Sequence, residues 1–234
     1  MPLYAGYTIV FDLDGTLVDT APDLTAALNH VLVSEGRQAL PLAEVRNLVG
    51  HGARALLERG MGAAGHTPAE PELQRLLQTF LSYYGANIAS HSTLFPGVTE
   101  TLAHFRAQQA RLGVCTNKPA GLSEALFTAL NMQGHFDAVL GSDSLPVRKP
   151  DPLHLTETIR KAGGDPARAV MVGDSATDVN TARAANIPVV LVSFGYTQIP
   201  ARELGADRVI DRFDALTQVL PGLLQLDPRG QSTL

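Results

Sequence analysis

Short apolar runs alternate along the chain with stretches in which apolar residues recur every three or four positions. The runs are rich in β-branched residues and have the length of buried strands. They cover residues 7–11, 112–116, 138–140, 169–172, 189–192 and 208–210. Helical spacing lies between them, as over 124–130 and 178–185. This alternation predicts an α/β fold with a doubly wound, Rossmann-like parallel sheet.

Residues 18–87 break the alternation. They hold four stretches with one apolar face each and no convincing strand, which predicts an inserted α-helical cap. Within this insert, the turn-forming residues at 60–65 and 67–68 indicate a loop. We therefore predict a Rossmann-like core over 1–17 and 88–226, a helical cap over 18–87, and a loose C-terminal tail over 227–234.

Composition narrows the classes of partner. The single cysteine, Cys115, excludes an intramolecular disulfide and a zinc site built on several thiolates. No apolar run approaches the ~20 residues that span a bilayer, and the N-terminus lacks a basic signal-peptide flank. We expect a cytoplasmic protein with no membrane partner, either a monomer or a homodimer. The net charge is −5 and the arginines are scattered, which disfavours a nucleic-acid partner.

Two pairs of acidic residues follow predicted strands. Asp12 and Asp14 end the first strand, and Asp174 and Asp178 follow the strand at 169–172. Ligands of open α/β sheets bind outside the carboxyl ends of the strands, so we expect both pairs at one site. Carboxylates brought together repel one another unless a cation lies between them. Ligation by oxygen alone suits Mg²⁺, which the sequence therefore predicts as a cofactor.

Two further predicted loops offer groups that bind phosphate. Thr116 and Asn117 close the second strand with a hydroxyl and an amide. Lys149 lies in a proline-bracketed loop and is one of only three lysines, with Lys118 and Lys161. A hydroxyl, an amide and an ammonium beside a metal indicate a phosphorylated ligand.

The order of these motifs closely resembles that of the haloacid-dehalogenase-like superfamily of hydrolases. The matching segments are Asp12-Leu-Asp-Gly-Thr16, Thr116, Lys149 and Gly173-Asp-Ser-Ala-Thr-Asp178. The resemblance implies that Asp12 is the nucleophile that becomes aspartyl-phosphate. It implies that Asp14 is first the general acid and then the base. Thr116 and Lys149 would hold the phosphoryl oxygens.

The same resemblance implies a Mg²⁺ site formed by Asp12, Asp174 and the main-chain oxygen of Asp14. Asp178 and Ser175 are expected directly behind these ligands, where Asp178 would support the metal's water shell or Lys149. The carboxylate of Asp14 also separates the chain from dehalogenases of the superfamily, which lack one at that position.

Within the superfamily, the chain most resembles the bacterial phosphoglycolate phosphatases. The shared segments include Val18-Asp-Thr-Ala-Pro-Asp23, Val49-Gly-His-Gly-Ala53, Thr116-Asn-Lys-Pro119 and Phe194-Gly-Tyr-Thr197. This implies hydrolysis of 2-phosphoglycolate to glycolate and phosphate. Those enzymes usually have asparagine at the position of His51, which is therefore either a substrate contact or an exposed residue at a helix start. Arg54 is either a partner for the substrate carboxylate or a solvated helix position.

Two alternatives remain at this point. One is a phosphatase of the same superfamily that acts on a sugar phosphate, a nucleotide or pyrophosphate. The other is a binding or regulatory protein on the same scaffold. Such a protein is expected to have lost part of the acid, metal and lysine set. All its members are present here, which favours an enzyme whose partner is a small phosphorylated metabolite.

Overall fold

In the computed structural model, which describes residues 2–226, six parallel strands form the central sheet. Their order is β5-β4-β1-β6-β7-β8, so the first strand of the chain lies in the middle. The strands are β1 (Thr8–Phe11), β4 (Arg111–Cys115), β5 (Ala138–Leu140), β6 (Ala169–Gly173), β7 (Val189–Val192) and β8 (Arg208–Ile210). The predicted doubly wound sheet and all six of its predicted strands are confirmed.

Helices cover both faces of this sheet, which explains why the strands are apolar without interruption. Ile9 and Phe11 of β1 pack on one face in a core shared with α5 and α9, whereas Val10 packs on the other face with α7 and α8. The flanking helices are α5 (Val98–Ala107), α6 (Ala120–Ala129), α7 (Pro152–Lys161), α8 (Ala176–Ala184) and α9 (Leu216–Leu223). No helix within residues 2–226 is long and apolar enough to cross a membrane.

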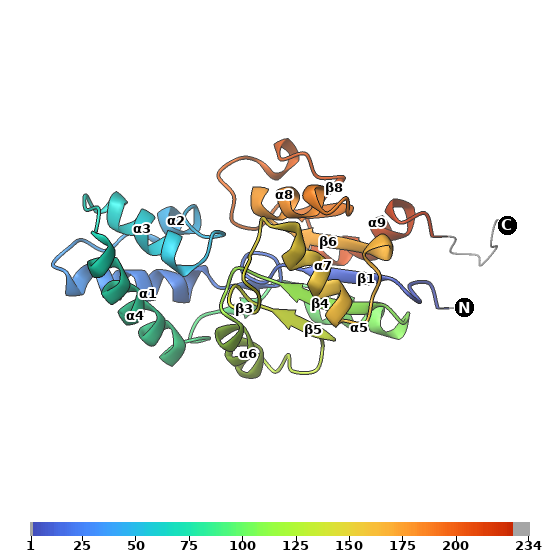
Figure 1. The fold of residues 1–234 in the computed structure, drawn as a ribbon, viewed down its shortest axis with the longest axis horizontal. Coiled ribbons are helices and arrows are strands. Elements are labelled where there is room, and N and C mark those ends of the chain that lie inside the picture. Colours follow the sequence, from blue (N-terminus) through green and yellow to red (C-terminus); the bar gives the residue numbers. More distant parts are fainter. Residues whose placement is uncertain (1, 227–234) are drawn as a thin grey trace.

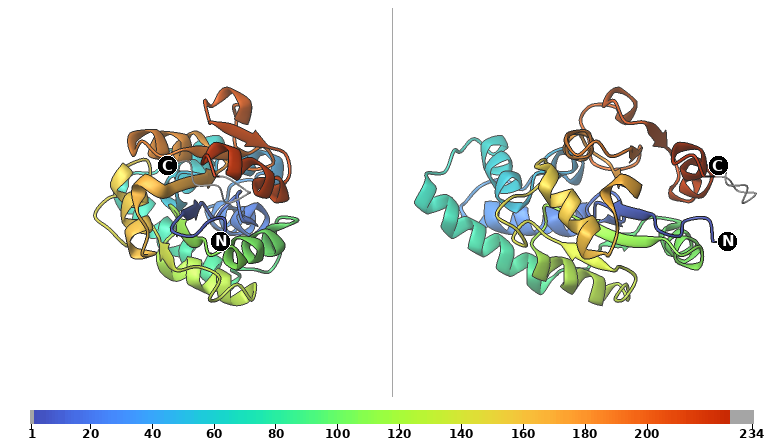
Figure 2. Two further views of the ribbon diagram at one scale, coloured as in Figure 1. Left: turned by 90° about the vertical axis from the view of Figure 1, so that its right-hand side faces the viewer. Right: turned by 45° about the vertical axis from the view of Figure 1, so that its right-hand side comes forward.

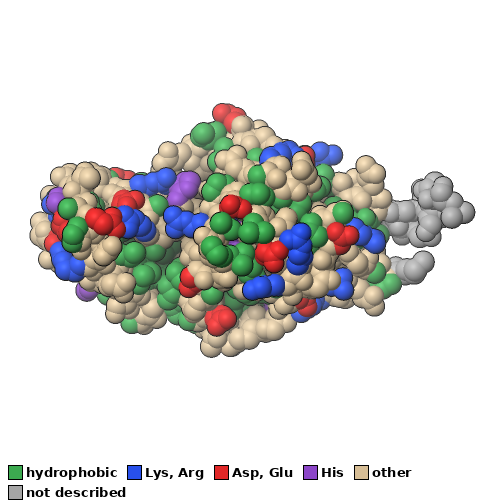
Figure 3. Space-filling model, in the orientation of Figure 1, with side chains coloured by type: hydrophobic (Ala, Val, Ile, Leu, Met, Phe, Trp, Pro, Cys, Tyr) green, Lys and Arg blue, Asp and Glu red, His purple; other side chains and the backbone are tan. Residues whose placement is uncertain are grey.

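Four helices that follow β1 form a second lobe beyond one end of the sheet (Figures 1 and 2). They are α1 (Ala21–Ser34), α2 (Leu42–Arg46), α3 (Ala53–Ala63) and α4 (Glu70–Ala86). Their apolar faces bury one another in a cluster separate from the two sheet cores. The prediction of four helices is confirmed. Figure 3 shows basic and histidine side chains gathered where the two lobes meet.

The predicted loop at 60–65 is wrong over its first four residues, because α3 continues to Ala63. Glycine disfavours a helix interior by about 1 kcal/mol relative to alanine. Here Gly60 is buried against α1, where a Cβ atom would lie 2.6 Å from Leu28 Cδ1. Close packing of two helices therefore outweighs the local preference. The chain leaves the helix only at Ala64–Gly65, and 67–68 is a loop as predicted.

The expectation of no strand within 18–87 is also wrong at its first two residues. Val18–Asp19 forms β2, which pairs antiparallel with β3 (Thr93–Leu94). Val18 is fully buried in the sheet core rather than among the cap helices. The outgoing and returning chain segments thus lie side by side. The predicted tail at 227–234 lies outside the described residues.

A buried carboxylate joins these two chain segments. Asp23, near the start of α1, accepts hydrogen bonds from the main-chain nitrogens of His91 and Ser92, at 3.0 and 2.8 Å. The Ser92 hydroxyl donates to it at 2.6 Å. Burial alone would raise the pKa of Asp23, but the hydrogen bonds from Ser92 and His91 outweigh burial and lower it. The charged form of Asp23 therefore holds α1 to the segment that returns to β3.

Replacing this carboxylate is expected to destabilise the protein in a pH-dependent way. Asp23→Asn should lower the free energy of unfolding by about 1–3 kcal/mol at pH 7, because hydrogen bonds to a buried charge are lost. The pKa of Asp23 is lowered in the folded state, so its stabilisation is fully present above the unfolded value of about 3.9, begins to be lost below that value, and is lost completely only as the pH falls through the lower folded pKa.

Urea unfolding at pH 7, 5 and 3.5 measures this difference. The difference in stability between wild type and Asp23→Asn should be the same at pH 7 and 5 and smaller at pH 3.5. Glu124→Gln, which removes an exposed carboxylate on α6, serves as the control and should match the wild type throughout. A loss in Asp23→Asn that is equal at all three pH values would contradict the role of the charge.

Candidate active site

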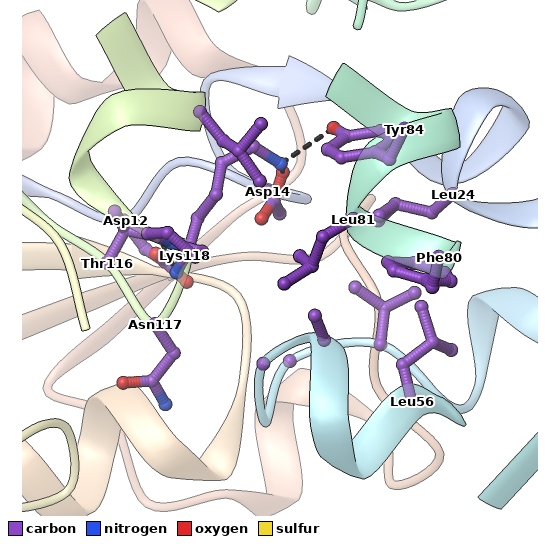
Figure 4. Close-up of a pocket in the computed structure, with 16 residues that line it drawn as sticks. Asp12, Asp14, Leu24, Leu56, Phe80, Leu81, Tyr84, Thr116, Asn117 and Lys118 are labelled. Carbon is purple, nitrogen blue, oxygen red and sulfur yellow. Dashed lines mark hydrogen bonds and ion pairs between the residues drawn. The ribbon is translucent and has the colours of Figure 1, made fainter. Parts of the chain in front are cut away.

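The candidate site lies where the carboxyl ends of β1, β4 and β6 meet the helical lobe. These strands are neighbours in the sheet, so their following loops converge. A cavity of about 40 Å³ opens there. Polar side chains from the sheet lobe line one side and apolar side chains from the helical lobe line the other (Figure 4). The lining includes Asp12, Asp14, Thr116, Asn117 and Lys118 from the former and Leu24, Leu56, Phe80, Leu81 and Tyr84 from the latter.

Three carboxylates converge behind the floor of this cavity. Asp12, Asp174 and Asp178 are all buried, and each places an oxygen within 4.8 Å of the others. Asp178 accepts hydrogen bonds from the main-chain nitrogen and the hydroxyl of Ser175, at 3.1 and 2.8 Å. This capping interaction at the start of α8 fixes its side chain. Three of the four carboxylates predicted at the strand ends are thus brought together.

Lys149 supplies the positive charge within this cluster. Its Nζ lies 2.9 Å from Asp12 Oδ1 and 2.7 Å from Asp178 Oδ1. Burial opposes the ammonium, but the two carboxylates outweigh burial and raise the pKa of Lys149, so the side chain stays charged. The Lys149 loop is held by Asn117, whose Nδ2 donates to the Lys149 main-chain oxygen at 3.2 Å.

One ammonium does not balance three buried carboxylates. Burial, together with the neighbouring acids, raises the pKa of Asp12 to about 6 despite Lys149. Burial and the charges of Asp178 and Asp12 also raise the pKa of Asp174 well above its usual range. A divalent cation would remove this excess of negative charge, and a set of carboxylate oxygens is the donor set that hard cations prefer. The residues present therefore fit a bound metal ion.

The loops around Asp174 fix its orientation. Its Oδ1 accepts a hydrogen bond from Thr16 Oγ1 at 3.3 Å, and its Oδ2 accepts from the main-chain nitrogen of Tyr196 at 2.6 Å. Gly15 approaches the same carboxylate so closely that a Cβ atom would overlap it. Its φ of +83° is also one that other residues rarely adopt. Two separate constraints, the close approach to Asp174 and the positive φ, therefore require glycine at position 15.

Asp14 faces the cavity and is held by a residue that sequence reasoning did not assign to the site. Its Oδ1 accepts hydrogen bonds from Thr20 Oγ1 at 2.7 Å and from Lys118 Nζ at 2.9 Å. Lys118 is buried, and its Nζ also donates to the Tyr84 hydroxyl at 2.7 Å. The scarcity of lysine in the chain, together with the position of Lys118 two residues after Thr116, was the available signal.

The remaining predicted residues divide between the cavity and the surface. Thr116 lines the cavity, and its Oγ1 accepts from the main-chain nitrogen of Lys118 at 3.2 Å. His51 lies beside α8, with Nδ1 3.4 Å from Thr177 Oγ1, and is not among the cavity-lining residues. Burial, then the charge of Arg59, lowers the pKa of His51.

Arg54 is not brought to the cavity. Its guanidinium lies on the exposed side of α3, 3.0 Å from Glu58 and 2.6 Å from Glu70. Of the two readings that the sequence left open, the solvated helix position is the one that this structure shows. A substrate carboxylate in the cavity therefore needs another partner.

Comparisons with known proteins agree with this geometry. Residues 9–192 match the family model described as haloacid dehalogenase-like hydrolase. A protein from Mesorhizobium japonicum named phosphoglycolate phosphatase is 52% identical over 209 residues, which cover 89% of this chain and 92% of the relative. One of the same name from Caulobacter vibrioides is 51% identical over 208 residues, with 89% and 88% covered.

Solved structures of similar proteins also match this chain over most of its length. One described as a "predicted phosphoglycolate phosphatase" from Haemophilus somnus has a TM-score of 0.86 and 33% identity, and the match covers 92% of this chain and 97% of that chain. CbbY from Rhodobacter sphaeroides in complex with xylulose-(1,5)bisphosphate has a TM-score of 0.76 and 26% identity, with 90% and 96% covered. The resemblance predicted from the motifs is confirmed. The chain belongs to the haloacid dehalogenase-like hydrolase family.

Proposed function

We propose that this hydrolase is a magnesium-dependent phosphatase that converts 2-phosphoglycolate to glycolate and phosphate. The observation that carries the proposal is the buried cluster of Asp12, Asp174, Asp178 and Lys149, which lies directly behind the floor of a small cavity between the lobes. Relatives more than 50% identical are named for this substrate.

The metal site is part of the proposal. Asp12, Asp174 and the main-chain oxygen of Asp14 would hold Mg²⁺, which when bound supplies charge neutralisation and orientation of the phosphoryl group. A carboxylate attacks a phosphate dianion only if positive charge lies between them. Lys149, already paired with Asp12, provides part of that charge, and Asp178 and Ser175 hold Lys149 and the helix start in place.

The remaining steps assign roles to side chains at the cavity. Asp12 attacks phosphorus and forms an aspartyl-phosphate, which splits one slow hydrolysis into two displacements. Thr116, Asn117 and Lys149 would hold the phosphoryl oxygens. Asp14 would protonate the leaving oxygen and later take a proton from water. Within residues 2–226 its hydrogen bonds fall on Oδ1, so Oδ2 is the oxygen that remains for this proton transfer.

The size of the cavity and the residues that the helical lobe contributes to it favour a small substrate. A cavity of about 40 Å³ corresponds to only a few water molecules, at roughly 10–15 Å³ for each. The side chains of Leu24, Leu56 and Phe80 offer no hydrogen-bond partner for the hydroxyl groups of a sugar or a nucleoside. We propose that residues 18–87 act as a cap that excludes bulk water and selects the leaving group. A sugar phosphate is the second candidate, because CbbY was solved with xylulose-(1,5)bisphosphate.

The substrate proposal is tested by comparing kcat/KM for 2-phosphoglycolate, hexose phosphates, xylulose 1,5-bisphosphate, nucleotides and pyrophosphate in Mg²⁺. We expect the highest value for 2-phosphoglycolate. Asp12→Asn should lower turnover by at least ~10³-fold while remaining folded, since an amide is a very poor nucleophile here. This variant also controls for contaminating phosphatases. A higher kcat/KM for a sugar phosphate or pyrophosphate would contradict the assignment.

Metal dependence has two independent readouts. Chelation should abolish activity and added Mg²⁺ should restore it. Because binding stabilises only the folded state, Mg²⁺ at 100 times its Kd should also stabilise the protein by about 2.7 kcal/mol, seen as a rise in Tm. Asp174→Asn should lose this rise and Glu124→Gln should keep it. Full activity in excess chelator, or the same rise in Asp174→Asn, would remove the proposed metal site.

The role of Asp14 is tested by the basicity of the leaving group. An alkoxide is strongly basic and needs a proton, whereas a nitrophenolate leaves unaided. Asp14→Asn should therefore slow the first step for an alkyl phosphate by roughly 10²–10⁴-fold more than for nitrophenyl phosphate.

Steady-state rates would conceal this difference, because Asp14 also serves the second step, which both substrates share. Rapid-mixing experiments should show a burst of nitrophenolate about equal to the enzyme concentration, followed by slow turnover. No burst, together with equal single-turnover losses for both esters, would show that Asp14 is not the acid.

A further inference from the structure

Lys118 lies between the two lobes and lines the cavity of the proposed site. It comes from the loop after β4, and its side chain is 3% exposed. Its Nζ lies 4.4 Å from the centre of the Tyr84 ring, in addition to the hydrogen bond to the Tyr84 hydroxyl. Figure 4 shows this hydrogen bond at one side of the cavity, where it joins Lys118 of the sheet lobe to Tyr84 of α4. Burying an ammonium in this way is costly unless it has a specific partner.

Among the described residues, two donors beside the cavity have no acceptor: one N–H of Lys118 and the hydroxyl of Tyr84. A lysine ammonium has three N–H donors. Within residues 2–226, Nζ uses one for Asp14 and one for Tyr84. Tyr84 accepts with its oxygen, so its own O–H has no acceptor among these residues. Burial, more than any other cause, raises the pKa of Tyr84 to about 12, so this hydroxyl keeps its proton.

Charge on the cavity wall singles out the same residue. Among the described residues that line the cavity, Lys118 is the only cationic side chain, and it faces Asp12, Asp14 and apolar residues. A carboxylate that enters an apolar cavity without a partner pays a large desolvation cost. Arg54 is engaged by Glu58 and Glu70 at the surface, and Lys149 is engaged by Asp12 and Asp178. Lys118 is the cation that lines the cavity, and although Asp14 accepts one of its N–H groups, another N–H remains for a second negative group of the substrate.

We propose that Lys118 and Tyr84 form the subsite that binds the carboxylate of the leaving group, with one N–H from Lys118 and the O–H of Tyr84. This inference rests on the proposed function and names the residues that select its substrate class, phosphate esters with a carboxylate close to the ester oxygen. Asp14 and Tyr84 then hold Lys118 in the cavity. Substrate selection thus requires one residue from each lobe.

The test compares 2-phosphoglycolate with 2-hydroxyethyl phosphate, which has a neutral group of similar size in place of the carboxylate. The measured quantity is the ratio of the two kcat/KM values. Lys118→Met should lower this ratio by about 10- to 100-fold, the worth of a hydrogen bond to a charged group. Tyr84→Phe keeps the ring and should lower it by about 3- to 10-fold, the worth of a neutral donor.

Two controls separate recognition from the positioning of Asp14. Thr20→Val removes the other hydrogen bond to Asp14, so both esters should slow together and the ratio should stay at the wild-type value. Tyr83→Phe alters the neighbouring tyrosine of α4, which stacks on His30 away from the cavity, and should also leave the ratio unchanged. If Lys118→Met does not fold, Tyr84→Phe decides the question.

The outcomes distinguish the subsite from the proposed function. A wild-type preference for 2-phosphoglycolate that falls in both variants supports the subsite. The same preference with an unchanged ratio in Tyr84→Phe and Lys118→Met overturns the subsite and leaves the proposed function intact. Equal kcat/KM for the two esters in the wild type would also overturn the subsite, whereas the proposed function fails only if a sugar phosphate, a nucleotide or pyrophosphate is the better substrate.

Discussion

Negative charge confined at the carboxyl ends of β1 and β6 is the constraint on which the rest of this structure depends. Three buried carboxylates share one ammonium, and burial raises the pKa of Asp12 and Asp174. Such a cluster is stable only if every surrounding group is positioned precisely. The placement of β1 between β4 and β6 achieves this, because it puts Asp12, Thr116 and Asp174 on three adjacent loops.

The parts of the site that lie at strand ends were predictable from sequence. A continuous apolar run that ends in Asp12-Leu-Asp14 predicts both the strand and the direction in which its carboxylates point, because the topology of parallel sheets fixes where ligands bind. The same holds for Asp174 and Asp178. Lys149 was identifiable because lysine is scarce, and the structure places it 2.9 Å from Asp12.

The contacts between the lobes were not predictable in this way. Lys118 and Asp14 are 104 positions apart, and Lys118 and Tyr84 are 34 apart, with no periodicity that relates them. Arg54 was an open question because nothing local shows that Glu70 lies beside it in space. The turn-forming residues at 60–65 suggested a loop. The local sequence does not show that Gly60 packs against Leu28 of a different helix. In each case tertiary contact overrides what the local sequence indicates.

Tyr196 connects the helical lobe with the carboxylate cluster through its hydrogen bonds. Its main-chain nitrogen donates to Asp174, while its hydroxyl donates to Asp19 at 2.6 Å and accepts from the main-chain nitrogen of Ala21 at 2.9 Å. Burial and the charge of Asp19 raise the pKa of this hydroxyl, so it remains a donor. Its ring packs within the apolar cluster of the helical lobe.

A single residue therefore links a proposed metal ligand to the point where the chain enters the helical lobe. Lys118 makes a second link, from Asp14 to α4. A movement of the helices relative to the sheet would change the hydrogen bonds of Tyr196 to Asp19 and Ala21 and of Lys118 to Tyr84, and both residues also hydrogen-bond to a carboxylate of the site. The arrangement of the acidic groups and the closure of the cavity are consequently one structural property, which explains why buried polar side chains, and not only apolar contacts, join the lobes.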